Sequence, residues 1–295
     1  MNAAPDSTSA SISVTRDESF AFVQALATEL SSGKVELMGF PDVAVRVQKV
    51  LADEEVSTDR VVRVIGSEPV LATQLLQISN SVALNPVGKP VTDLRTAVAR
   101  VGLNIVRTTT IAFAVRQLRS AAVLKPIEKP LTELWQRNVL IASLCHVLAR
   151  RFSRVNADTA LLTGMLQGIG RLYIMTRSIQ YPALFANLAS YQAIERDWHL
   201  SVATALLENW EVAEEIVQAV RDSEDLARET RGAVSLTDIL VAANLIVIHQ
   251  DQPELLGVRL QSVKTVARLQ LNAQMCEGIL HESAAEIEAL REALG

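Results

Sequence analysis

Apolar residues recur at intervals of three and four positions along most of the chain. Val43, Val47 and Val50 form one such stripe, and the pattern continues in several later segments as far as residue 294. This period places the apolar side chains on one face of a helix, whereas a half-buried strand would alternate every second residue. The pattern therefore predicts an all-α protein built from amphipathic helices.

Capping residues and helix breakers suggest where several helices begin and end. Ser57 is a predicted N-cap, Pro69 stands in a first turn, and Thr92 is placed to cap the helix that follows it. Gly33 and Gly102 are placed to end helices, because glycine readily adopts the left-handed conformation found after a last turn. We expect one helix to close at Gly102 and another to run from residue 105 to 118.

Two prolines, Pro126 and Pro130, bracket a connector that is the best candidate for a boundary between two helical lobes. The resulting division comprises a flexible tail (1–16), a leading helix (17–34), lobe one (35–128), lobe two (131–228) and a C-terminal helical extension (229–295).

Three glycines, Gly164, Gly168 and Gly170, fall inside a predicted helix from residue 157 to 179. Glycine inside a helix is unfavourable by about 1 kcal/mol relative to alanine. We therefore expect these glycines to allow close approach of neighbouring helices or a local break.

Composition narrows the possible functions. The chain is 49% hydrophobic with 4% aromatic residues, which indicates a globular protein with an aliphatic core. A net charge of -5 without a basic block argues against nucleic acid as a partner. The run from Ile239 to Ile248 is too short to cross a membrane, and the N-terminus lacks the pattern of a secretory signal. Cys145 and Cys276 are predicted to be buried thiols, and the protein is predicted to be cytoplasmic.

No catalytic constellation is visible in the sequence. The four histidines, at positions 146, 199, 249 and 281, are scattered, and no two lie one helical turn apart. A glycine-rich phosphate loop and a serine hydrolase elbow are also missing. We expect no metal and no other cofactor.

Several segments nevertheless resemble a known family, the HDOD family of bacterial signalling domains, whose C-terminal half is related to HD-type phosphohydrolases. The matching segments are residues 39–41, 69–81, 96–103, 134–135, 164–172 and 199–210. Their order and spacing make the resemblance specific, and it covers about residues 35–228. It implies a two-lobed helical HDOD fold whose second lobe is a degenerate HD-like bundle.

The sequence departs from HD-type hydrolases where those enzymes hold a metal. Arg137, Gln167 and Gly168 stand at the positions of the first histidine and of the His-Asp doublet, and Ser223 and Glu224 replace a later histidine pair. An amide, a glycine and a permanent cation are poor ligands for a divalent ion. The resemblance therefore implies a member that lacks the metal-binding residues.

One histidine of the pattern, His199, is retained, either as a remnant ligand or as a core histidine. Together with Arg137, Gln167 and Arg171 it forms the candidate site. These residues are either a vestigial pocket for an anion such as a nucleotide phosphate, which arginine suits, or a polar interface between lobes.

The resemblance implies a non-catalytic signal-transduction protein that binds response regulators or diguanylate-turnover proteins, with a nucleotide as a further candidate ligand. The alternative is a metal-dependent phosphohydrolase with atypical ligands, drawn from His199, Asp197, Asp158 and Glu195. The charged segment from Ser223 to Arg231 is either an exposed docking loop or a solvated connector. The partner, the direction of regulation and the oligomeric state stay open.

Overall fold

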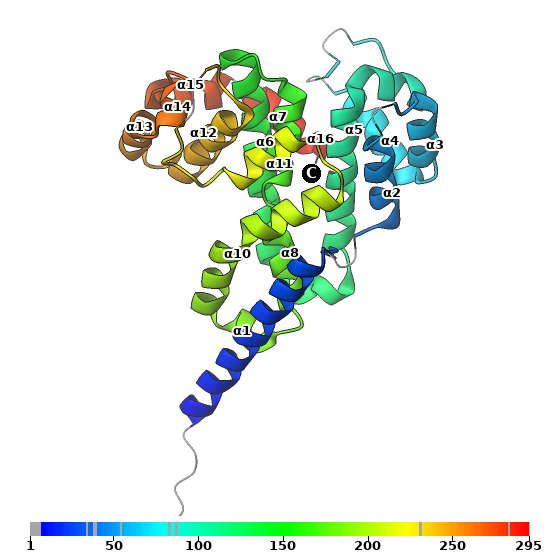
Figure 1. The fold of residues 1–295 in the computed structure, drawn as a ribbon. Coiled ribbons are helices and arrows are strands. Elements are labelled where there is room, and N and C mark those ends of the chain that lie inside the picture. The colour runs from blue at the N-terminus through cyan, green and yellow to red at the C-terminus, as the bar shows by residue number, and fades with distance from the viewer. Residues whose placement is uncertain are drawn as a thin grey trace, which may run out of the picture.

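A computed structural model describes residues 7–33, 35–37, 40–53, 55–81, 84–85, 88–229, 232–282 and 284–294. Every regular element in these ranges is a helix, so the predicted all-α class is confirmed (Figure 1). The helices are α1 (Ser7–Ser32), α2 (Asp42–Leu51), α3 (Thr58–Gly66), α4 (Pro69–Ser79), α5 (Leu94–Arg119), the 3-10 helix η1 (Ala122–Ile127), α6 (Glu128–Phe152), α7 (Ala157–Leu166), α8 (Ile169–Ser178), α9 (Pro182–Ala186), α10 (Leu188–Asn209), α11 (Glu214–Arg221), α12 (Leu236–His249), α13 (Pro253–Ser262), α14 (Lys264–Ala267), α15 (Ala273–Glu282) and α16 (Ala284–Leu294).

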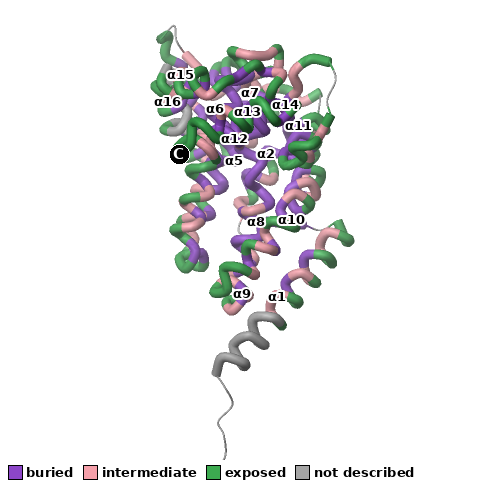
Figure 2. Tube along the Cα trace, turned by 90° about the vertical axis from the view of Figure 1, so that its left-hand side faces the viewer, coloured by how far each residue is buried: buried purple, intermediate pink, exposed green. Residues whose placement is uncertain are grey.

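The long helices α5 and α6 occupy the middle of the molecule. Helices α2 to α4 pack on α5, α7 packs along α6, and α12 to α15 lie beyond them on the other side (Figure 1). The last helix, α16, returns to contact α4, α5 and α6. Buried residues gather where α5, α6 and α7 meet (Figure 2). They belong to one apolar cluster that runs from Phe22 to Ile287.

Helix α5 is also long and apolar enough to cross a membrane, which the sequence reading missed. Its most apolar window is 72% buried inside the protein. The apolar side chains are therefore used against other helices, as in the central helix of a packed core.

Several predicted helix ends are confirmed and others shift. Ser57 accepts a hydrogen bond from the backbone N–H of Arg60 at 3.3 Å, as an N-cap should. The cap of α5 is Asp93 rather than Thr92, because the Asp93 carboxylate accepts from the Thr96 N–H at 2.8 Å. Helix α1 begins at Ser7, well before the predicted start at residue 17.

Three predicted breaks are wrong in detail. Gly102 does not end its helix; it adopts φ 77° and ψ 168°, and α5 continues beyond this kink. The proline connector is largely helical, since η1 leads into α6 and Pro130 lies in the first turn of α6. The separate helices expected after residues 182 and 201 are the short α9 and one long helix, α10.

The glycines of residues 157–179 do both things expected of them. The predicted single helix breaks between α7 and α8 at Gly168. A Cβ on Gly164 would lie 2.5 Å from the Ala142 Cα, so this glycine lets α7 approach α6 closely.

Both cysteines are buried, as predicted. Burial raises the pKa of the Cys276 thiol to about 11 and raises that of Cys145 as well, so both stay protonated at neutral pH. Two motif residues, Gly39 and the predicted loop's Pro86, lie outside the described residues.

Candidate functional site

The break between α7 and α8 turns the site of the lost His-Asp doublet toward α6. Gln167 donates a hydrogen bond from its Nε2 to the Asn138 Oδ1 at 2.9 Å, and this pair is buried. A Cβ on Gly168 would lie 2.1 Å from the Asn138 Nδ2. The Asn138 amide therefore occupies the space that a side chain at position 168 would need.

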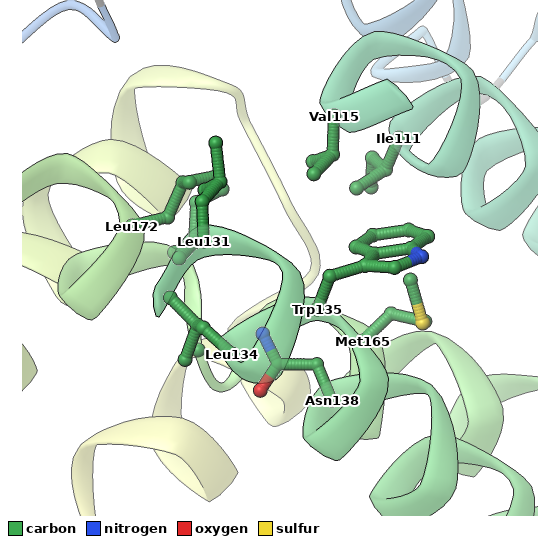
Figure 3. Close-up of a pocket in the computed structure, with 10 residues that line it drawn as sticks. Ile111, Val115, Leu131, Leu134, Trp135, Asn138, Met165 and Leu172 are labelled. Atoms are coloured by element: carbon green, nitrogen blue, oxygen red, sulfur yellow. The ribbon is translucent and has the colours of Figure 1, made fainter. Parts of the chain in front are cut away.

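A small cavity lies beside this amide pair (Figure 3). Its walls come from α5, α6, α7 and α8, and Trp135, Asn138 and Met165 are among the residues that line it. Its volume is about 10 Å³, which is room for about one water molecule. The cavity is too small for a nucleotide.

The retained histidine lies on the other side of α8, in an ionic network with Arg171 and Glu224. Arg171 Nη2 donates to the Glu224 Oε1 at 2.9 Å, and its Nη1 lies 3.2 Å from the His199 Nδ1. His199 Nε2 is 3.1 Å from the same Glu224 oxygen, although the direction is not that of a regular hydrogen bond. The His199 side chain is 1% exposed.

The network also fixes the proton on the imidazole. A guanidinium only donates, so the Nδ1 of His199 must accept from Arg171 and the ring proton must be on Nε2, facing Glu224. A metal binds a histidine through a free nitrogen lone pair. In this arrangement neither ring nitrogen of His199 offers one.

Glu224 responds strongly to these neighbours. The contact with His199 lowers its pKa, burial opposes the change, and Arg171 lowers the pKa further, to about 2 from an ordinary 4.5. The carboxylate is therefore ionised at every pH at which the protein is expected to work.

Further charges extend the network. Arg171 Nε lies 4.0 Å from the Glu195 Oε1. Burial lowers the pKa of Arg137, as does the nearby Arg171, while Glu195 and Glu224 oppose the change. With a neutral His199, the two arginines and the two glutamates cancel.

Close packing of α8 on α10 brings the network together. A Cβ on Gly170 would lie 1.9 Å from the His199 backbone oxygen, so only glycine allows this approach. The next residue, Arg171, is thereby held against His199.

The structure joins the four predicted site residues only in part. Arg137, Arg171 and His199 share the ionic network, but Gln167 is hydrogen-bonded to Asn138 instead. Because the positive charges are balanced within the chain, the arrangement resembles a polar interface more than an open anion pocket. The role of these residues as a ligand site stays a prediction.

The alternative ligand set is not assembled. Asp158 lies 3.6 Å from His146, and Asp197 is 61% exposed and paired with Arg196. Within the described residues, no three His, Cys, Asp or Glu side chains are grouped in a way that could hold a metal.

Sequence reasoning missed two residues of this site. Asn138 follows Arg137 directly, and nothing in the sequence marks it as the partner of Gln167. Glu224 was considered only as a lost ligand, although a negative charge at that position was a signal that arginines elsewhere had a partner.

Comparison with protein families now identifies the fold. A family model for the HDOD domain matches residues 37–226. The chain belongs to the HDOD family. The HDOD fold inferred from the sequence is thereby confirmed. A search of curated proteins finds no match.

Solved structures of other HDOD-like proteins agree in fold. A candidate metal-dependent phosphohydrolase from Shewanella amazonensis SB2B superposes with a TM-score of 0.71 and 21% identity, covering 95% of this chain and 100% of that one. An HDOD domain protein of unknown function from Geobacter sulfurreducens gives 0.63 and 21%, covering 91% and 97%. A candidate signal transduction protein from Marinobacter aquaeolei VT8 gives 0.61 and 18%, covering 96% and 65%. At these identities the likeness shows the fold alone.

Proposed function

We propose that this HDOD protein is a non-catalytic component of bacterial signal transduction that acts by binding other proteins. The observation that supports the proposal best is the state of His199. Its Nδ1 accepts from Arg171, and its Nε2 faces Glu224 at 3.1 Å. The one histidine retained from the HD pattern is thus used to hold α8, α10 and the segment after α11 together.

The same region argues against hydrolysis at the HD-like site. Metal-assisted hydrolysis requires an ion with an open position for water. The Asn138 amide fills the space beside Gly168, and Arg137 adds a positive charge near the network. A divalent cation would therefore meet a cation and two amides where HD enzymes supply ligands.

A phosphate-release assay tests the non-catalytic part of the proposal. The purified chain should release no phosphate from nucleotides or from p-nitrophenyl phosphate, with Mn²⁺, Fe²⁺ or Zn²⁺ added. The active alternative, suggested by the name of the Shewanella protein, predicts release that disappears in the His199→Ala variant. Such a result would overturn the proposal.

The docking segment predicted from the sequence is held by internal ion pairs in its described part, residues 223–229. Glu224 contacts Arg171, Arg228 Nε lies 3.7 Å from the Asp222 Oδ2, and Lys264 Nζ is 2.6 Å from the Glu229 Oε1. Arg231, at the end of that prediction, lies outside the described residues. These pairs favour the connector interpretation, so the docking surface is to be sought elsewhere.

Partner capture tests the binding part. The full chain, used as bait in lysate of the source bacterium, should enrich response regulators or diguanylate-turnover proteins, and the purified partner should bind the chain directly. The Lys129→Ala variant, changed at an exposed lysine of α6, serves as a handling control. Failure of every enriched candidate to bind directly would contradict the proposal.

A further inference from the structure

A large cleft lies away from the HD-like site, between α2 and the C-terminal end of α10. Its volume is about 860 Å³, within the range of small-molecule sites. The segment before α2 forms one wall, which is tied to α10 because Asn209 Nδ2 donates to the backbone oxygens of Gly33 at 3.1 Å and of Val35 at 3.3 Å. The cleft is therefore shaped by segments far apart in the sequence.

Gln48 of α2 lines this cleft and has no hydrogen-bonding partner. The residue is 1% exposed, and neither its Oε1 nor its Nε2 is hydrogen-bonded. Buried polar side chains in folded proteins are almost always paired, so an unpaired amide at the base of a cleft needs an explanation. A ligand that reaches the base of the cleft would satisfy both atoms.

The amide specifies the chemistry of such a ligand. A glutamine side chain presents a donor and an acceptor side by side, which is the pattern that pairs with the edge of a purine base. The cleft also contains Trp210, whose ring is stacked on Phe40 with centroids 5.0 Å apart and an angle of 19°. An aromatic surface of this kind stacks on bases irrespective of their identity.

Charged residues of the cleft complete the pattern. Lys49 is exposed and forms no ion pair with any part of the chain that the structure describes, so it is available to a phosphate. Arg46 is exposed too and donates only to the Ser67 Oγ, at 3.3 Å. Glu36 and Asp42 are exposed carboxylates that can accept from ribose hydroxyls, as an acidic residue does in dinucleotide-binding folds.

We propose that this cleft binds a purine nucleoside monophosphate. The base pairs with the Gln48 amide beside Trp210, the ribose faces Glu36 and Asp42, and the phosphate lies against Lys49. The site is separate from the ionic network of α8 and α10 and does not depend on the proposed docking function.

Calorimetric titration of the full chain with AMP, GMP, adenosine and guanosine tests the proposal. At least one monophosphate should bind saturably with a dissociation constant below about 1 mM. Gln48→Leu should weaken that binding at least about fivefold, the lower limit for a lost bidentate contact to a base. Lys49→Ala should weaken binding of the monophosphate and leave that of its nucleoside unchanged. Lys129→Ala, an exposed lysine outside the cleft, should change neither.

The absence of saturation by both monophosphates up to about 1 mM would overturn the proposal. Unchanged affinity in a folded Gln48→Leu variant would do the same. If Gln48→Leu does not fold, Lys49→Ala decides, because the substitution is at the surface: a monophosphate that loses no affinity relative to its nucleoside contradicts the site. Hydrogen exchange adds a second readout, since the bound ligand should protect α2 and the end of α10.

Discussion

At the scale of single residues, the HD-like site shows how a metal position is replaced by charges that satisfy one another. Arg171 contacts Glu224, a residue 53 positions later in the chain, and both contact His199. Arginine at a former ligand position would be unfavourable if it were buried alone, because an unpaired charge keeps its desolvation penalty. Glu224 removes that penalty and uses the histidine as well.

The replacement of Glu224 by glutamine tests this balance. Glu224→Gln should lower the free energy of unfolding at pH 7 by about 1 kcal/mol, a small value because the side chain is 47% exposed. Since folding depresses the pKa of Glu224 from 4.5 to about 2, the ionic contribution is complete above pH 4.5 and disappears as the pH falls toward 2. Urea titrations at pH 7 and pH 3 should therefore show a smaller difference between variant and wild type at pH 3.

The matched control is Glu215→Gln, an exposed glutamate with no ion pair to the described part of the chain. It should change the stability little at either pH. A pH-independent effect of Glu224→Gln would show that the carboxylate acts through packing and not through its charge.

At the scale of helices, close approach decides how the site is built. Gly170→Ala should lower the free energy of unfolding by about 3 kcal/mol or more, because the new Cβ meets the backbone oxygen of His199 at 1.9 Å and α8 must move away from α10. The comparison is Gly278→Ala in α15, where nothing lies within 4 Å and alanine should stabilise the helix by about 0.5–1 kcal/mol. Equal effects at the two glycines, measured by denaturant unfolding, would contradict the close packing.

Restoring the HD doublet at the start of α8 is a second prediction at this scale. Gln167→His combined with Gly168→Asp should neither bind a metal tightly nor create activity, because the Asn138 amide lies 2.1 Å from the place of the new Cβ and Arg137 remains nearby. Equilibrium dialysis with Mn²⁺ and Zn²⁺ checks this. Tight metal uptake by the double variant would count against the assignment of these positions.

The sequence predicted some elements better than others for physical reasons. The limits of α12 are as predicted, since Ser235 and Asp238 form a local capping box that the sequence alone can show. Gly102 was expected to end a helix, but Val101 and Ile105 are buried on both sides of it, and tertiary packing carries α5 across the kink. The lost metal ligands were readable in the sequence, whereas the contact between Arg171 and Glu224 depends on how α8 and α11 meet in space.

At the scale of the whole molecule, α16 connects parts of the chain that lie far apart in the sequence. It contacts α4, α5 and α6, and Ile287 is 6% exposed within the common core. Ile287→Ala should lower the free energy of unfolding by about 2–4 kcal/mol. Val258→Ala, at a position that is 62% exposed, should have almost no effect. Similar thermal shifts for the two variants would show that α16 adds little to the core.

The most direct test of the account is the metal content of the purified chain. Protein produced with iron, manganese and zinc in the medium should carry far less than one ion per chain when measured by inductively coupled plasma mass spectrometry, because His199 is engaged by Arg171 and Glu224. One tightly held ion per chain that is lost in the His199→Ala variant would contradict it.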